Sequence, residues 1–254
     1  MQSTKPLNNK NNETVTFAWI DNGLVDGKFA DNLINTIFKL KNNNVNITGS
    51  FRVSGNQIPR QRQNLIDYWY NNIKSDWIMC IDSDIVVTSE SFSLLWESAD
   101  KELRPVVCGV YFISKQSELS LMEPMPSIFM DTENKYISEM IYPLPHNQLI
   151  PIDTSGFGFV LMHRSIIPKI IKISKNLSMF AENQEIGNNF ISEDISFFRK
   201  LKQCGIQLYA HTGALVEHIK RFSLDINYYN LYWADIEDGR LVKPNVIEKK
   251  HESF

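Results

Sequence analysis

Two acidic residues, Asp82 and Asp84, follow directly on the apolar run Trp77 to Ile81. A run of this kind, bounded by polar residues, is typical of a central strand that is buried on both faces of a parallel sheet. Ligands bind in the crevice beyond the carboxyl ends of such strands. Two carboxylates placed there repel each other unless a cation lies between them, and Mg²⁺ or Mn²⁺ binds hard oxygen ligands together with phosphate oxygens. The position favours a metal and diphosphate site over a solvated turn in which one aspartate caps the next segment.

A histidine could add a nitrogen ligand to these carboxylates. His218 ends the predicted strand at 214–218, and a mixed oxygen and nitrogen set would favour Mn²⁺ over Mg²⁺. An ordinary, partly buried histidine is the alternative. His211, seven residues earlier, is a rival ligand, and the sequence alone does not choose between the two.

Two further segments carry polar residues that could contact a substrate. Arg60 and Asn64 share one face of a predicted helix, where they could present donors to a phosphate or a base, whereas Arg62 is expected to point elsewhere. A solvated polar face explains the same pattern. Asp153 and Gly156 precede a predicted strand at 157–162, where the glycine would allow a close backbone approach to a ligand or form a bulge.

A second acidic motif, Ser192-Glu193-Asp194, begins a predicted helix. Serine is a good N-cap residue, and acidic residues in a first helical turn interact favourably with the helix dipole. Capping and the dipole therefore account for the motif without any chemistry.

The elements that would position these residues alternate between strands and helices. In the first half the patterns predict strands at 15–20, 45–53, 77–81 and 105–112, and helices at 26–40, from 58 onward and at 89–100. Right-handed crossovers then produce a mostly parallel sheet flanked by helices. Prolines between 113 and 151 indicate hairpins where the chain direction reverses. Strands at 157–162, 206–210 and 214–218 and helices at 166–173 and 192–204 follow, the last ended by Gly205.

Composition excludes several classes of protein. The 254 residues are 43% hydrophobic and 22% charged, which is typical of a globular protein with one large or two small domains. A net charge of −3 without a basic run argues against nucleic acid as a partner. The three cysteines, Cys80, Cys108 and Cys204, lack paired spacing, which fits buried thiols in a reducing compartment. Without an apolar stretch of roughly 18 residues or a secretory signal, a cytoplasmic protein is expected, in the host cytoplasm if the source is viral.

Taken in order, these features resemble the GT-A-fold glycosyltransferases, particularly the family-2-like and viral or phage-type members. The matching segments are the first strand, the helix with Arg60 and Asn64, DSD at 82–84, VVCGVYF at 106–112, SGFGFVLMHR at 155–164, SED at 192–194, and His218. The resemblance spans about residues 14 to 220. It implies an α/β fold of the Rossmann-like GT-A type, with a small mixed β region on the acceptor side.

The resemblance also implies an activity: metal-dependent transfer of a sugar, with inversion, from a nucleoside-diphosphate sugar to an acceptor hydroxyl. A UDP-sugar is the default donor. The implied site residues are Asp82, Asp84 and His218 for Mn²⁺ or Mg²⁺; Trp19, Arg60, Asn64, Asp82 and Ser83 for the donor; Asp153, Gly156 and Glu193 for the acceptor or sugar; and Asp194 as the general base. A carboxylate suits that last role when burial or a neighbour such as Glu193 raises its pKa.

The predicted organisation has three parts. Residues 1–12 form a disordered tail, 13–220 a single catalytic domain, and 221–254 a C-terminal extension. Within the domain, 13–112 form the nucleotide-binding half and 113–220 the acceptor and metal half. The sequence does not determine the sugar, the acceptor or the oligomeric state.

Two other functions compete with this hypothesis. The segment IMCIDSDIVV at 78–87 also resembles the nucleophile motif of haloacid-dehalogenase-type phosphotransferases, in which Asp82 would attack phosphate. No second acidic pair of the Gly-Asp-x-x-x-Asp kind follows it. A non-catalytic module that binds a nucleotide sugar is the other alternative, and the presence of both acidic motifs argues against it.

Overall fold

The computed structural model describes residue 10 and residues 12–116, 122–132, 138–175, 177–181, 183–184, 190–220 and 226–240. The chain divides into two compact units, Met1–Lys115 with Glu123–Ile219, and Gln116–Met122 with Lys220–Phe254. In the second unit the described part is mainly one helix, α6 (Ile226–Glu237). None of the helices described is long and apolar enough to cross a membrane.

The predicted tail at 1–12 lies outside the described residues, apart from Lys10 and Asn12. The Lys10 ammonium lies 4.8 Å from the ring centroid of Trp77 and 4.5 Å from that of Trp96. A cation over an indole face is attracted by the ring quadrupole. Lys10 therefore packs on the first unit, contrary to the expectation of a disordered tail at this position.

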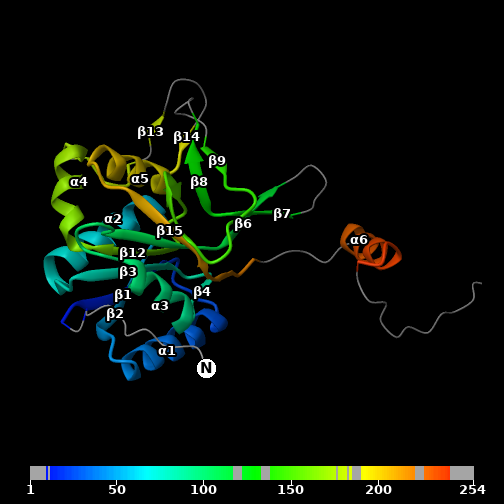
Figure 1. The fold of residues 1–254 in the computed structure, drawn as a ribbon, viewed down its shortest axis with the longest axis horizontal. Helices are drawn as coiled ribbons and strands as arrows, with labels where there is room; N and C mark the ends of the chain where they lie inside the picture. Colours follow the sequence, from blue (N-terminus) through cyan, green and yellow to red (C-terminus); the bar gives the residue numbers. More distant parts are fainter. Residues whose placement is uncertain are drawn as a thin grey trace, which may run out of the picture. The chain divides into compact units, whose positions relative to one another are not determined.

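The first unit contains a seven-stranded sheet in the order β10-β15-β5-β12-β3-β1-β2 (Figure 1). Its strands are β1 (Thr14–Asp21), β2 (Asn46–Ser54), β3 (Trp77–Asp82), β5 (Val106–Val110), β10 (Leu149–Ile152), β12 (Phe159–His163) and β15 (Leu208–Leu215). β1 pairs in parallel with β2 and β3, and β5 pairs in parallel with β15. β12 runs antiparallel between β3 and β5, and β10 runs antiparallel to β15. The sheet is mostly parallel, as expected, and the direction reverses in the second half of the chain.

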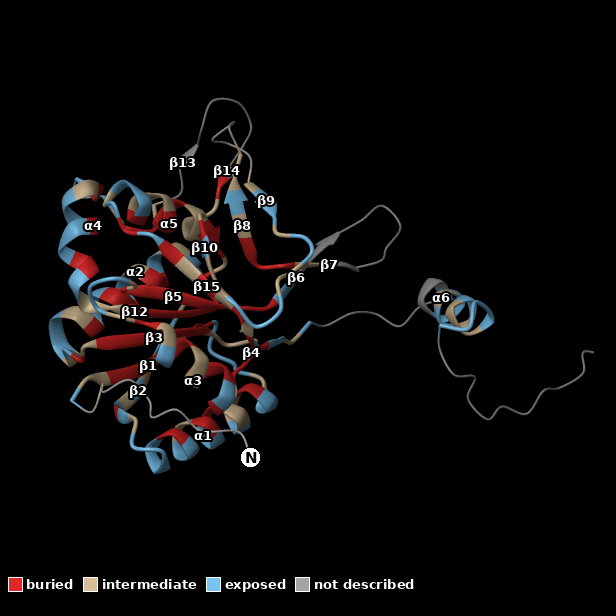
Figure 2. Ribbon diagram, viewed as in Figure 1, coloured by how far each residue is buried: buried red, intermediate tan, exposed pale blue. Residues whose placement is uncertain are grey.

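Helices cover both faces of this sheet. The helices are α1 (Gly27–Asn42), α2 (Ile58–Tyr68), α3 (Ser89–Ser98), α4 (Ile167–Ser174) and α5 (Glu193–Gln203). α1 and α3 lie on one face, and α2, α4 and α5 on the other (Figure 1). In β3, Trp77, Met79 and Ile81 pack with α1 and α3, whereas Ile78 and Cys80 pack with the other helices. β3 is therefore buried on both faces, as its apolar sequence predicts, and Figure 2 shows this burial.

Local signals explain where several helices begin and end. The Asp26 side chain caps α1 by accepting from the Lys28 backbone N–H, and Thr88 forms a capping box with Ser91 at the start of α3. α5 ends before Gly205, whose φ of 71° is the left-handed conformation that glycine adopts without strain. α2 continues into a short π-helix, Trp69–Ile73.

Shorter strands lie outside the seven-stranded sheet. These are β4 (Ile85–Val86) with β16 (Glu217–His218); β8 (Ile128–Asp131) with β9 (Ser138–Met140) and β11 (Thr154–Ser155); β6 (Phe112–Gln116) with β7 (Met122–Pro126); and β13 (Asn183–Gln184) with β14 (Phe190–Ile191). A 3₁₀ turn, Arg164–Ile166, leads into α4. The two strands expected at 206–210 and 214–218 are one strand, β15, followed by β16, because β15 continues through a register shift between Ala210 and Leu215 against β5.

Gly109, in β5, gives a direct test of the sheet packing. A Cβ atom there would lie 2.2 Å from Cδ1 of Phe159 in β12 and 2.5 Å from the backbone oxygen of Ala214 in β15. We expect Gly109→Ala to lower the free energy of unfolding by about 1–3 kcal/mol, because neither neighbour can move without disturbing the sheet. Urea unfolding measures the loss. Gly27→Ala in α1 is the control, since its Cβ would meet nothing within 4 Å, and equal midpoints for the two variants would contradict the packing.

Candidate functional site

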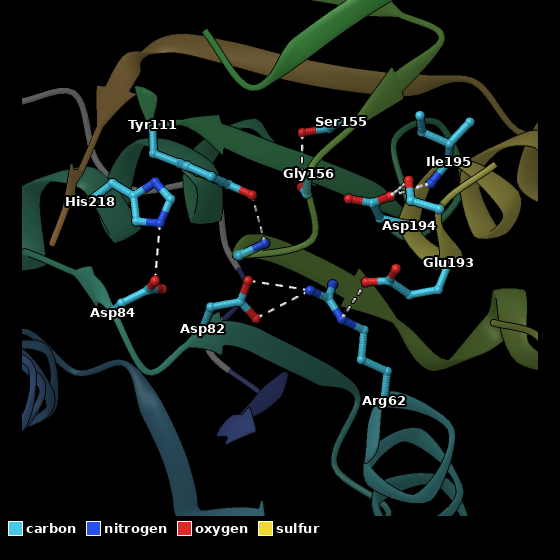
Figure 3. Close-up of polar contacts among 12 residues, drawn as sticks. Arg62, Asp82, Asp84, Tyr111, Ser155, Gly156, Glu193, Asp194, Ile195 and His218 are labelled. Carbon is cyan, nitrogen blue, oxygen red and sulfur yellow. Dashed lines mark hydrogen bonds and ion pairs between the residues drawn. The ribbon is translucent and has the colours of Figure 1, made fainter. Parts of the chain in front are cut away.

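The DSD motif lies where β3 ends, and a short strand pair places His218 beside it. Asp82 is the last residue of β3, and β4 follows at Ile85. β4 pairs antiparallel with β16 so that Ile85 lies opposite His218. The imidazole Nε2 of His218 then lies 3.1 Å from Oδ2 of Asp84 (Figure 3). The structure therefore brings His218 to Asp84 through backbone pairing.

The other ring nitrogen of His218 determines what this contact means. Nδ1 lies 2.8 Å from the backbone oxygen of Phe112. A carbonyl oxygen only accepts hydrogen bonds, so Nδ1 carries the proton and donates it. In the neutral ring the lone pair of Nε2 then faces the Asp84 carboxylate, and the two repel unless a proton or a cation lies between them. An Nδ1–H donated to a backbone carbonyl is also how metal-binding histidines are commonly oriented.

The rival histidine does not share this position. His211 pairs through its backbone with Leu149 of β10, and its Nδ1 accepts from the backbone N–H of Gly213 at 3.2 Å. Only one of the two histidines therefore contacts Asp84 in the part of the chain that the structure describes.

Arg62 is the principal cation of the site. As expected, it points away from the exposed face of Arg60 and Asn64, but no motif indicated its role. Its side chain is 7% exposed, and Nη2 donates to both carboxylate oxygens of Asp82, at 3.2 and 3.4 Å. Nε lies at ion-pair distance, 3.4 Å, from Oε1 of Glu193 (Figure 3). The guanidinium lies 4.8 Å from the ring centroid of Phe157. Arg62 therefore joins the DSD motif to the SED motif.

The burial of Arg62 has a specific cause in the sequence. Arg62 precedes Leu65 by three residues and Ile66 by four. These spacings place it on the apolar stripe of α2, where Leu65 and Ile66 are buried. A cation on a buried stripe needs a buried anion, and this was the signal in the sequence that could have identified it.

Burial and charge act in opposite directions on these groups. Burial raises the pKa of Asp82 and of Glu193, and the Arg62 charge opposes the rise in both. Burial alone would lower the pKa of Arg62, but Asp82 and Glu193 favour its charge, and the pKa is raised. Arg62 Nη1, also buried, meets no hydrogen-bond acceptor among the described residues, so a donor remains for a ligand.

The SED motif begins α5 at the expected position, but the Ser192 side chain makes no cap hydrogen bond to the helix backbone. Ser192 is the N-cap of α5, and Glu193 and Asp194 lie in its first turn. Oδ1 of Asp194 accepts from the Ser192 hydroxyl and from the backbone N–H of Ile195, the latter at 2.7 Å. These hydrogen bonds fix the orientation of the carboxylate beside Glu193 (Figure 3).

Tyr111 is a second residue that the sequence analysis missed. Its hydroxyl oxygen accepts from the backbone N–H of Gly158 at 3.3 Å, and its ring lies edge-on to His218. Burial raises the pKa of the phenol, so the hydroxyl keeps its proton. A Cβ at Gly156 would lie 2.0 Å from this oxygen, and one at Gly158 would lie 3.0 Å from Oδ2 of Asp82. The close approach expected at Gly156 is therefore to the protein's own tyrosine.

The residues expected to bind the donor lie at the ends of β1 and β2. Arg60 and Asn64 are exposed on α2 and line a cavity of about 460 Å³, together with Ser54, Gly55, Asn56, Gln57 and Gln61. Trp19 donates from Nε1 to Oδ2 of the buried Asp21 at 3.2 Å, and Asp21 also accepts from Ser54 at 2.6 Å. Ser54 lines the cavity and donates to Asp21, so the cavity is close to the carboxylate that accepts from Trp19.

Asp153 has a different set of partners. Its Oδ1 is 2.5 Å from Nζ of Lys202, and its Oδ2 accepts from the backbone N–H of Asp131 at 2.9 Å. These contacts tie β8 and the segment before β11 to the second half of α5. The contacts that the structure describes do not connect Asp153 with Asp82, Asp84 or Glu193.

A metal ion would find two suitable side chains here. No group of three or more His, Cys, Asp or Glu side chains is arranged to hold a metal ion among the described residues. The carboxylate of Asp82 faces Arg62, which leaves Asp84 and His218 as the fitting pair. One oxygen and one nitrogen ligand match Mn²⁺ when phosphate oxygens and water complete its coordination.

Comparisons with known proteins support the fold. Neither a protein-family model nor a curated protein sequence matches the chain. Among solved structures, A197 from STIV is similar over 82% of this chain and 86% of its own, with 19% identity and a TM-score of 0.53. The expected fold class, an α/β fold of the GT-A, Rossmann-like type with a mostly parallel sheet flanked by helices, is confirmed.

Two other structures are similar at lower TM-scores. GalNAc-T7 with UDP, GalNAc and Mn²⁺ has 12% identity and a TM-score of 0.44, and the match covers 83% of this chain and 44% of that one. CMP:2-keto-3-deoxy-manno-octonic acid synthetase complexed with CTP has 11% identity and a TM-score of 0.40, over 90% and 100%. At these TM-scores neither structure adds to the evidence for the fold.

The Arg62 ion pairs predict how the stability of a variant depends on pH. Arg62→Met leaves Asp82 and Glu193 without their cation, and we expect it to lower the free energy of unfolding by about 3–5 kcal/mol at pH 7. Without Arg62, the two folded-state pKa values rise further above their unfolded values. The folded variant then binds protons as the pH falls, so its deficit against the parent protein shrinks between pH 7 and about 4.

Urea unfolding at several pH values measures this effect. Arg62→Lys is the matched control, because it keeps the charge and loses only the fork of donors, and we expect a smaller deficit that changes less with pH. A deficit of Arg62→Met that is the same at pH 5 and pH 7 would contradict the coupling of these charges.

Proposed function

We propose that the chain is a metal-dependent glycosyltransferase that moves a sugar from a nucleoside-diphosphate sugar, with UDP-sugars favoured, to an acceptor hydroxyl with inversion. The observation that carries the proposal is the 3.1 Å contact between Oδ2 of Asp84 and Nε2 of His218. This contact lies at the carboxyl end of β3, in the DSD motif, and Arg62 joins this motif to the SED motif. Ligands of open α/β sheets bind at such strand ends.

Asp84 and His218 are the residues that would hold Mn²⁺, or Mg²⁺. When bound, the ion supplies a Lewis acid for the negative charge that develops on the departing diphosphate. Asp82, held by Arg62, and the adjacent Ser83 would lie near the ribose and phosphates of the donor. Arg60 and Asn64, in their cavity at the end of β2, would contact the nucleoside.

Asp194 is the general base in this proposal. Hydrogen bonds from Ser192 and Ile195 engage its Oδ1, so we assign Oδ2 as the atom that takes the proton from the acceptor hydroxyl. Removal of that proton as the new bond forms is the contribution expected of a positioned carboxylate. Glu193, oriented by Arg62, and the protonated Tyr111 hydroxyl would bind hydroxyls of the acceptor or of the transferred sugar.

The contacts of Asp82 favour this function over phosphotransfer. A nucleophilic aspartate needs a carboxylate oxygen free to attack phosphorus. Both oxygens of Asp82 accept from Arg62. Glycosyl transfer requires no attack by Asp82 and is consistent with this arrangement.

Metal-dependent donor binding is the first test. We expect UDP or a UDP-sugar to raise the melting temperature when Mn²⁺ is present and not when a chelator replaces it, because only the metal offsets the acidic charge of the site. Asp84→Ala and His218→Ala should lose this shift. Asp153→Ala, outside the group, is the control and should keep it. A nucleotide shift of equal size in chelator would overturn the metal-dependent mechanism.

The role of Asp194 is tested by separating binding from transfer. Asp194→Asn keeps the shape and the Oδ1 acceptor for Ser192 and Ile195 but removes the proton acceptor, so we expect transfer to fall by about 10²–10⁴-fold. The thermal shift with donor and Mn²⁺ should remain. Nuclear magnetic resonance of the product reports the anomer and therefore inversion or retention. An Asp194→Asn variant that transfers sugar at the parent rate would exclude Asp194 as the base.

A further inference from the structure

A larger cavity lies between α4 and α5, apart from the candidate site. Its volume is about 780 Å³, within the usual range for sites that bind small organic molecules. Among the described residues, five of those that line it are Lys or Arg and none is Asp or Glu: Lys169, Lys172, Lys175, Arg199 and Lys200. The cavity therefore has a positive lining in a chain whose net charge is −3.

Lys200 shows that this charge is only partly compensated. Its Nζ donates to the backbone oxygens of Ser178, at 3.0 Å, and Met179, at 2.9 Å. An ammonium group has three N–H donors, so one remains. No carboxylate of the described residues forms an ion pair with Lys200, and burial lowers its pKa. A partly desolvated cation without a counter-ion is stabilised when an anion binds beside it.

Ser174 provides an independent observation. It is the last residue of α4, is 4% exposed and lines the cavity, yet its hydroxyl has no hydrogen-bond partner in the described structure. Buried hydroxyl groups are normally hydrogen-bonded, because desolvation without a partner costs free energy. A ligand oxygen in the cavity would supply the missing partner.

The rest of the lining is apolar. Ile173, Leu177 and Ile191 contribute side chains to the same cavity. The space and these contacts fit a ligand that has an organic part as well as an anionic group. Several cations and a hydroxyl in the lining of one cavity match a phosphate, whose oxygens accept several hydrogen bonds at once and which lysine commonly binds.

We propose that the cavity between α4 and α5 binds a small phosphate-bearing molecule, with its phosphate against Lys200, Ser174 and the lysines of α4. This is a second ligand site. Asp194 lies two residues before Ser196, which lines the cavity, and therefore roughly 200° around the helix. The lining shares no residue with the Asp82, Asp84, Glu193 and His218 group.

The test uses the full chain without Mn²⁺ or nucleotide. Calorimetric titration and thermal shift are measured with inorganic phosphate and with glucose 1-phosphate, against glucose and against chloride at equal ionic strength. We expect glucose 1-phosphate to bind and to raise the melting temperature, and glucose to do neither. Binding should weaken by at least about tenfold in Lys169→Glu/Lys172→Glu, because two attractive charges become repulsive. Lys39→Glu/Lys41→Glu, on the exposed side of α1, is the matched control and should bind normally.

Ser174→Ala separates a ligand site from a structural feature. Removing an unpartnered buried hydroxyl should leave the melting temperature of the free protein unchanged or higher, while the shift with glucose 1-phosphate becomes smaller. Vesicles of phosphatidylcholine with and without phosphatidic acid distinguish a lipid headgroup from a soluble phosphate. Vesicle binding that depends on phosphatidic acid and is lost in Lys169→Glu/Lys172→Glu would assign the lipid source.

Two results would overturn the proposal. One is that neither soluble phosphate nor phosphatidic acid vesicles bind beyond their controls. The other is that binding is equal in Lys169→Glu/Lys172→Glu and in Lys39→Glu/Lys41→Glu. The thermal shift with UDP-sugar and Mn²⁺ belongs to the other site and should be the same in both double variants.

Discussion

The candidate site depends on one buried interaction, the contact of the Arg62 guanidinium with Asp82 and Glu193. Carboxylates removed from water require a partner charge, and breaking such a pair is costly. Because Arg62 belongs to α2, Asp82 to β3 and Glu193 to α5, one side chain holds three elements together on one side of the sheet. The positive charge of Arg62 therefore offsets the electrostatic repulsion between the two acidic motifs, which can lie close to each other. Arg62 Nη1 still has a hydrogen to donate to a ligand.

Backbone pairing positions His218, whereas an ion pair with Arg62 positions Glu193. The β4 and β16 pair sets His218 opposite Ile85, and the Phe112 carbonyl fixes the proton on Nδ1. Nε2 and the Asp84 carboxylate then lie 3.1 Å apart. Small residues complete the arrangement, because side chains at Gly156 and Gly158 would collide with Tyr111 and crowd Asp82. The site thus combines a rigid strand end with a short, separately paired strand.

Strong periodic patterns were sufficient for most of the fold. The alternation of β3 between the two hydrophobic cores follows from its five apolar residues, and the glycine after α5 marks a real helix end. The strand break expected between 210 and 214 was wrong, because β15 continues from Leu208 to Leu215 through a register shift in its pairing with β5. Lys10, which was assigned to a disordered tail, packs on Trp77 and Trp96. The sequence did not predict this packing because the two tryptophans are distant from Lys10 in the chain.

The sequence by itself determined the α/β class, the strand that ends at Asp82 and the candidate residues of both acidic motifs, because helical and strand periodicities and strand ends are local properties. Only the tertiary structure decided which of these residues meet. It placed His218 rather than His211 at Asp84, separated Asp153 from the group, and turned Arg62 inward. Such choices depend on pairing register and on the neutralisation of buried charge between segments that are separated in the chain, and no local pattern encodes either one.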